Sequence, residues 1–152
     1  MRILIFDDKP TITYFIQEYL DGKGHDLMFC NTCSKVREEM QTSEFDCYIV
    51  DLNAATVGLD DELQARTQGG LLTGWLLLTE YVWKEDAHGF TKTIIFSDYV
   101  AELKQYIASD KASDREKGWF TNLERCGHVI SKSEKLAALV KAIDLINARG
   151  DS

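Results

Sequence analysis

Three aspartates directly follow two short, largely apolar stretches of this chain. Asp7 and Asp8 come after Arg2–Phe6, and Asp51 comes after Cys47–Val50. If both stretches are strands of one parallel sheet, the three carboxylates gather at the same edge of that sheet. Two such charges about 4 Å apart repel by roughly 4 kcal/mol at an effective dielectric constant of about 20. A neutralising partner is therefore required, and a divalent cation is the simplest candidate.

A hydroxyl group and an ammonium group follow two further apolar stretches. Ser97 comes directly after Thr93–Phe96, and Lys132 comes shortly after His128–Ile130. Phosphoryl transfer depends on positioning and charge neutralisation, so it needs a carboxylate nucleophile, a bridging Mg²⁺ and a cation opposite. A site with few carboxylates and several waters suits Mg²⁺. These residue types are compatible with phosphoryl chemistry.

Each of these residues also has an ordinary structural explanation. Asp8 could cap the helix that follows it, and Asp51 could bond its own backbone. Ser97 could cap a helix over Asp98–Ile107, and Lys132 could be a solvated surface charge. For each residue taken alone, the sequence leaves these alternatives open.

The elements that must position these groups can be read from hydrophobic periodicity. β-rich stretches alternate with helix-period segments, and strands that are apolar on both faces suit a buried parallel sheet. This alternation predicts a three-layer, doubly wound α/β domain with a functional crevice beyond the carboxyl ends of its strands. The five predicted strands are Arg2–Phe6, Asp26–Cys30, Cys47–Val50, Thr93–Phe96 and His128–Ile130. The predicted helices are one from Pro10 up to Asp21, then Ser34–Met40, Leu71–Trp83, Tyr99–Ile107 and Glu134–Ala148.

An acidic pair, a lone aspartate, a hydroxyl and a lysine, in this order on strands one, three, four and five, resemble the receiver domain of two-component response regulators. The resemblance covers the whole chain and implies the CheY-like, flavodoxin-type (βα)5 fold, as a single domain over residues 1–152. It also implies that Asp51 is the phosphoacceptor and that Mg²⁺ is the cofactor. The implied metal ligands are Asp7, Asp8, Asp51 and the backbone carbonyl of Asn53, and the implied phosphoryl contacts are Ser97 and Lys132.

The same resemblance implies a function in signalling rather than enzymatic turnover. Asp51 would accept a phosphoryl group from a histidine kinase or a phosphotransfer protein, and Mg²⁺-dependent self-dephosphorylation would reset it. The modification would switch a surface that contacts a downstream protein or a fused output domain. Formation of a homodimer is compatible with this role.

Two other functions remain open at the level of sequence. One is an atypical receiver that binds its partners constitutively, which is favoured by two insertions and by Val129 at a position where an aromatic residue is usual. The other is a phosphatase similar to the haloacid dehalogenases, which also combine an aspartate nucleophile, a hydroxyl, a lysine and Mg²⁺. That family needs a second aspartate two residues after its nucleophile, whereas here Lys9 stands two residues after Asp7.

Two segments are longer than their counterparts in a typical receiver, namely residues 54–69 and residues 109–125. The first is polar and acidic and lies next to Asp51 in sequence, so we interpret it as a lid, a partner contact or a neutral surface insertion. The second carries Trp119 and Phe120. We expect both aromatic residues to be core anchors rather than binding hot spots.

Two smaller departures affect the surroundings of the predicted site. Ser133 follows Lys132 where the family usually has proline, which leaves the local turn undetermined. Tyr99, two residues after Ser97, resembles a bulky residue that shields the acyl phosphate from water, so we expect slow hydrolysis.

Composition restricts the partners and the location. A net charge of −8 and a pI near 4.8 argue against direct binding to nucleic acid, which relies on clustered Lys and Arg. The N-terminal apolar run is too short for a signal peptide, and Leu71–Trp83 falls short of the ~20 apolar residues of a membrane span. We therefore expect a cytoplasmic protein without membrane contact.

The four cysteines are expected to be small buried hydrophobes, with a redox or zinc role for the C-x-x-C pair Cys30 and Cys33 as the minor alternative.

Overall fold

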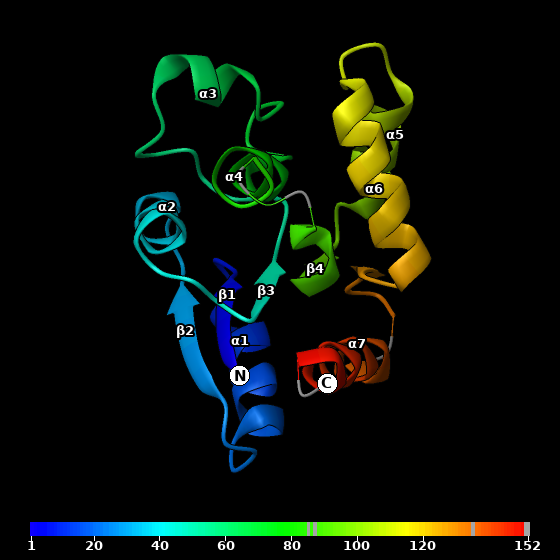
Figure 1. The fold of residues 1–152 in the computed structure, drawn as a ribbon. Coiled ribbons are helices and arrows are strands. Elements are labelled where there is room, and N and C mark those ends of the chain that lie inside the picture. The colour runs from blue at the N-terminus through cyan, green and yellow to red at the C-terminus, as the bar shows by residue number, and fades with distance from the viewer. Residues whose placement is uncertain (85, 87, 135, 151–152) are drawn as a thin grey trace.

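Five parallel strands form the centre of the molecule and confirm the predicted fold class (Figure 1). A computed structural model describes residues 1–84, 86, 88–134 and 136–150. The strand order is β2-β1-β3-β4-β5, the order of flavodoxin-like doubly wound sheets. The strands are β1 (Arg2–Phe6), β2 (Asp26–Cys30), β3 (Cys47–Val50), β4 (Thr93–Ser97) and β5 (Val129–Ser131).

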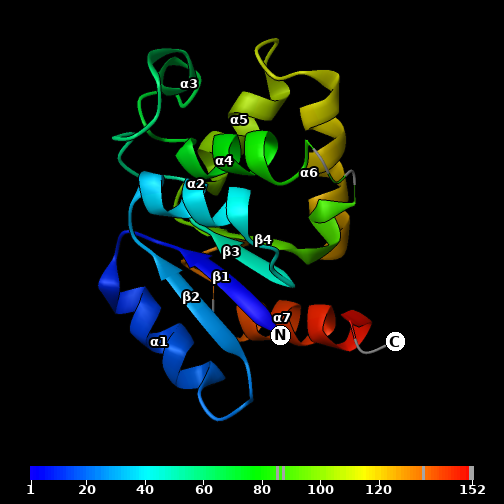
Figure 2. The ribbon, with the colours of Figure 1, turned by 60° about the vertical axis from the view of Figure 1, so that its left-hand side comes forward.

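Helices cover both faces of this sheet, which gives the three predicted layers (Figure 2). One face carries α1 (Pro10–Leu20) and α7 (Leu136–Gly150). The other carries α2 (Cys33–Thr42), α4 (Thr73–Tyr81), α5 (Val100–Ala108) and α6 (Asp114–Cys126), and the short helices are α3 (Asp61–Ala65) and η1 (Gly89–Lys92).

Side chains that alternate along each strand pack against the helices on both faces of the sheet. In β1, Leu4 and Phe6 belong to the cluster under α2, α4, α5 and α6, whereas Ile3 and Ile5 belong to the cluster under α1 and α7. All four side chains are at most 1% exposed. Because successive side chains of a strand point to opposite faces, a strand between two helical layers must be apolar throughout.

The predicted helices are present, with ends that shift by a few residues. The segment predicted as Leu71–Trp83 is helical over Thr73–Tyr81, and the one predicted as Glu134–Ala148 is helical over Leu136–Gly150. Residue 135 lies outside the described residues. Two elements were not predicted as helices: α3 lies inside the insertion at 54–69, and α6 occupies most of the insertion at 109–125.

The first insertion folds onto α2. Its buried Leu59 is 5% exposed and joins the cluster beneath α2 and α4. The guanidinium of Arg37 on α2 donates to the Gly58 carbonyl oxygen over 2.7 Å. The Asp60 carboxylate accepts a hydrogen bond from the Leu63 N–H, which caps α3. The insertion is therefore an ordered surface element with its own apolar anchor.

The second insertion contributes to the core. A capping box between Ser113 and Glu116 begins α6, and Gly127 ends it with φ 74°. Trp119 and Phe120 are 9% and 6% exposed, and the Trp119 ring centroid lies 5.3 Å from that of Trp83. The prediction that these aromatic residues are core anchors is confirmed, because packing within the chain already covers them.

Three of the four cysteines have the buried position that was expected, whereas Cys126 is partly exposed. Cys30, Cys33 and Cys47 are buried free thiols. Burial raises the pKa of Cys30 and of Cys33 to about 11, so both remain protonated at neutral pH. Among the described residues, no helix is long and apolar enough to cross a bilayer.

A glycine fixes the distance between α4 and the end of β3, and this contact gives a first prediction. The Gly74 N–H donates to the Leu52 carbonyl oxygen over 2.9 Å, and a methyl group at Gly74 would overlap the Asp51 carbonyl oxygen. We expect Gly74→Ala to lower the free energy of unfolding by about 1–3 kcal/mol, since the atom in the way is backbone. Denaturant titration measures this change.

Gly118 provides the matched control within α6, because a methyl group there would meet nothing within 4 Å. Gly118→Ala should leave stability unchanged or raise it by about 0.5–1 kcal/mol, through helix propensity. Equal stability of the two variants would contradict the proposed close contact at Gly74.

Candidate functional site

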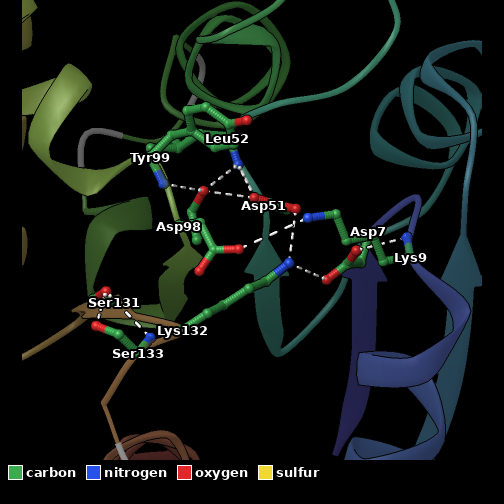
Figure 3. A network of polar contacts seen from close by, with 10 residues as sticks. Asp7, Lys9, Asp51, Leu52, Asp98, Tyr99, Ser131, Lys132 and Ser133 are labelled. Carbon is green, nitrogen blue, oxygen red and sulfur yellow. Dashed lines mark hydrogen bonds and ion pairs between the residues drawn. The ribbon is translucent and has the colours of Figure 1, made fainter.

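The sheet register brings the sequence-predicted residues to one edge. Phe6 pairs with Val50, so Asp7 and Asp51 both stand one residue beyond this pair. Ser97 pairs with Ser131, so Lys132 begins the turn beside Ser97. Figure 3 shows Asp7, Asp51 and Lys132 converging from the ends of β1, β3 and β5.

The Asp51 carboxylate accepts three hydrogen bonds, and the residue is buried at 4% exposure. Its Oδ1 accepts from the Ser97 hydroxyl over 2.6 Å and from the Leu52 N–H over 2.8 Å. Its Oδ2 accepts from the Lys132 ammonium over 2.9 Å. A bond to the local backbone therefore exists, but it is only one of three bonds that fix the carboxylate.

Ser97 is fully buried and links the site to the backbone around it. Its oxygen accepts from the Tyr99 N–H at 3.1 Å and from the Leu52 N–H at 3.3 Å. The alternative that Ser97 caps a helix over Asp98–Ile107 is wrong, because α5 begins at Val100 with Tyr99 at the N-cap.

Lys132 lies between two carboxylates. Its ammonium is 2.8 Å from Asp7 Oδ2 and 2.9 Å from Asp51 Oδ2, with each of the three side chains 5% exposed. The alternative of a solvated surface lysine is therefore wrong. Burial alone would lower the pKa of Lys132, but its bonds to Asp7 and Asp51 outweigh burial and raise the pKa, which keeps the side chain charged.

The turn after Lys132 does not need the usual proline. The Ser131 and Ser133 hydroxyls lie 2.8 Å apart, and the Ser133 N–H donates to the Ser131 hydroxyl over 3.3 Å. The Lys132 N–H donates to the Ser97 carbonyl oxygen over 3.1 Å. Two serines and a ladder bond thus hold the lysine in place.

The acidic pair completes a cluster of oxygen ligands. One carboxylate oxygen each from Asp7, Asp8 and Asp51 lies within 4.8 Å of the others. Asp8 is exposed, so the cluster opens toward solvent on one side. Lys9 rather than Asp8 is the N-cap residue of α1, and the Lys9 side chain makes no capping bond.

Charge and protonation both fit a divalent cation. Three carboxylates meet a single buried ammonium group, that of Lys132, so negative charge is in excess. Burial raises the pKa of Asp7, and the negative charge of Asp51 adds to the effect, although bonds from Lys132 and the Lys9 N–H oppose it. Three oxygen ligands with one open side suit Mg²⁺, which keeps several of its waters. The ligand role of the Asn53 carbonyl stays a prediction.

Sequence reasoning missed the backbone donors of the site and one ion pair at its rim. The Leu52 and Tyr99 N–H groups carry no side-chain signal that could have indicated them. The Lys9 ammonium lies 3.7 Å from the Asp98 carboxylate, which links the loop after β1 to the loop after β4 (Figure 3). Only the position of both residues after strand ends hinted at this contact.

The raised pKa of Asp7 leads to a prediction about stability. Because the folded state binds the Asp7 proton more tightly than the unfolded state does, ionised Asp7 destabilises the fold at neutral pH. Asp7→Asn should therefore raise the free energy of unfolding at pH 7 without Mg²⁺. This gain should shrink as the pH falls through the raised Asp7 pKa and vanish below the ordinary pKa of 3.8, where the side chain is protonated in both the folded and the unfolded state.

With Mg²⁺ added, the native chain should become more stable than Asp7→Asn. A ligand at 100 times its dissociation constant stabilises a fold by about 2.7 kcal/mol, which the native chain would gain and Asp7→Asn would largely lose. Urea titrations with and without Mg²⁺ measure both effects, and Asp144→Asn on the exposed surface of α7 is the control. Identical Mg²⁺ responses of the native chain and Asp7→Asn would argue against Asp7 as a ligand.

Comparison with solved structures identifies the fold of this chain. The sequence matches no protein-family model and no curated protein. Among solved structures, the CheY-like receiver domain from Methanospirillum hungatei is 18% identical with a TM-score of 0.58, over 99% of this chain and 98% of that one. Response regulator TrrA from Thermotoga maritima, in complex with Mg²⁺-BeF, is 17% identical with a TM-score of 0.61, over 95% and 97% of the two chains. Chemotaxis protein CheY4 from Vibrio cholerae is 15% identical with a TM-score of 0.56, over 95% and 97%. Over nearly its whole length, this chain has the fold of a CheY-like response regulator receiver domain.

Proposed function

We propose that this chain, as a single domain, accepts a phosphoryl group on Asp51 from a phosphohistidine of a histidine kinase or a phosphotransfer protein. The observation that best supports this proposal is the bonding of one buried carboxylate. Its two oxygens are held separately, one by Ser97 and the Leu52 N–H and the other by Lys132. Two further carboxylates lie within 4.8 Å of it.

In the transfer step an Asp51 oxygen attacks phosphorus. The P–N bond to the partner's imidazole breaks, a P–O bond to Asp51 forms, and the imidazole leaves with its ring nitrogen ready to take a proton. Lys132 and Ser97 are within bonding distance of Asp51, so they are close enough to donate to the phosphoryl oxygens that replace its negative charge. Water attack on phosphorus would later return free Asp51 and phosphate.

Mg²⁺ would be held by Asp7, Asp8, Asp51 and the Asn53 carbonyl. When bound, it would neutralise charge on the phosphoryl oxygens. Asp7 must lose its proton to bind a metal, and its raised pKa makes this step easier at higher pH.

The switch in this proposal starts at Ser97. Its oxygen holds the N–H groups of Leu52 and Tyr99, so a Ser97 that turns toward a phosphoryl group gives up these bonds. Tyr99 is the N-cap of α5, which packs against α6. A change at Asp51 would thus reach an exposed helical surface that a downstream protein, a fused output domain or a second copy could read.

A constitutive binding module is the second candidate. Val129, where an aromatic residue is usual, is part of β5 and packs against the core cluster. Valine has no aromatic ring that could change its position together with the hydroxyl residue, Ser97. The proposal for either function includes a cytoplasmic location, where buried free thiols such as Cys47 stay reduced.

Intact mass spectrometry with Mg²⁺ and acetyl phosphate tests phosphoryl transfer directly. We expect one phosphoryl adduct on the native chain and on Asp144→Asn, and none on Asp51→Asn. If the folded native chain binds Mg²⁺ but gains no adduct, constitutive partner binding becomes the better-supported function. Steady hydrolysis of a generic phosphate ester would instead support the phosphatase alternative.

Tyr99 gives a test of how long the modification lasts. Its side chain is half-buried against the core cluster, two residues after Ser97 in the sequence. Without it water should reach the phosphoryl group more easily, so Tyr99→Ala should shorten the lifetime roughly tenfold, or about 1.4 kcal/mol of barrier. Decay of the adduct mass after removal of acetyl phosphate gives the rate.

Tyr81→Ala is the matched control for this experiment, because Tyr81 is also half-buried against the same cluster but lies at the far end of α4. An unchanged lifetime in Tyr99→Ala would mean that this ring does not shield the phosphoryl group.

A further inference from the structure

The two inserted segments face each other across an open groove of about 550 Å³. One wall is the end of the first insertion, with Arg66 and Gln68, and the other is the start of α6. The floor is formed by α4, which lies between the two walls in Figure 1. No residue that lines the groove belongs to the Asp51 site.

Bonds within the chain fix both walls. The Arg66 guanidinium bonds the Glu80 carboxylate on α4 over 2.7 Å, which holds the first insertion against the floor. On the opposite side, the Glu116 carboxylate accepts from the Tyr106 hydroxyl over 2.9 Å and from the Trp75 indole N–H over 3.0 Å. A groove with fixed walls loses little conformational entropy when a ligand enters.

The lining is positively charged in a chain whose net charge is −8. Among the described residues that line it, the carboxylates are those of Glu80 and Glu116, and both are already bonded to groups of the protein. Its four cations are Arg66, Lys84, Lys111 and Arg115. Arg66 and Lys84 pair with Glu80, whereas no ion pair is found for Lys111 or Arg115 within the described part of the chain.

Lys111 and Arg115 therefore form the charged side of the groove. The Arg115 guanidinium lies 4.9 Å from the ring centroid of Trp119, a cation–π contact that orients it on the wall. Lys111 is exposed in the loop just before α6. Both come from the second insertion, so this charge belongs to a part of the chain that a typical receiver lacks.

We propose that this groove binds an acidic peptide segment of a partner protein. Its volume falls within the ~300–1,000 Å³ of ligand clefts, and its charge complements carboxylate side chains. A long nucleic-acid backbone would meet the repulsion of the remaining acidic surface. The proposal does not depend on phosphoryl transfer at Asp51, because the groove uses separate residues.

Fluorescence anisotropy with a labelled hexaglutamate peptide at low ionic strength tests the proposal. We expect the native chain to bind this peptide, and Lys111→Glu with Arg115→Glu to weaken binding by at least about tenfold. The control is Lys35→Glu with Lys141→Glu, which changes the net charge equally on exposed positions of α2 and α7. This control should bind nearly as tightly as the native chain.

Three results would overturn the proposal: no binding by the native chain, equal weakening in the two charge-reversed variants, or displacement of the peptide by equimolar inorganic phosphate. The last result would indicate a site for small anions. If circular dichroism shows that the groove variant is unfolded, Lys111→Ala with Arg115→Ala replaces it, and the same weakening is required.

Discussion

The Lys132 ammonium group between the Asp7 and Asp51 carboxylates is the interaction on which the candidate site depends. Taking charges out of water is costly, and a buried carboxylate persists only when it is paired and hydrogen-bonded. Asp51 satisfies this condition through Lys132 on one oxygen and through Ser97 and the Leu52 N–H on the other. Asp7 depends on the same lysine, so loss of Lys132 would leave two buried acids unpaired.

The parallel sheet brings Lys132 close enough to pair with Asp7 and Asp51. β1 and β3 are adjacent, and β4 and β5 continue the sheet on the side of β3, so four strands end at one edge. Side chains that are 81 residues apart in sequence thereby meet at 2.9 Å. The loops beyond the strand ends also supply N–H groups, which a helix or strand interior would already use within its own ladder.

The two insertions enlarge the domain without disturbing that edge. Leu59 and the aromatic residues of α6 extend the apolar cluster on one face of the sheet, away from the charged groups. Gly74 lets α4 approach the backbone at Asp51, so the end of β3 keeps its position beside a long polar insertion. Added apolar surface stabilises the fold roughly in proportion to its burial, whereas the charged edge tolerates only a narrow geometry.

Residue type and period alone determined the fold class, the five strands to within one residue at each end, and the order of the chemical groups. Strands buried on both faces must be apolar throughout and must end where polar residues begin. They also identified Asp7, Asp8, Asp51, Ser97 and Lys132 as one set. Only the tertiary structure decided that Lys132 is buried between two acids, that the Leu52 and Tyr99 N–H groups complete the site, and that the insertion carrying Trp119 is a core helix. The first two features are contacts between distant segments or bonds of the backbone, and neither leaves a periodic pattern in the sequence. The helix α6 does carry sequence signals, a capping box and a C-terminal glycine, but only packing shows that its aromatic residues join the core.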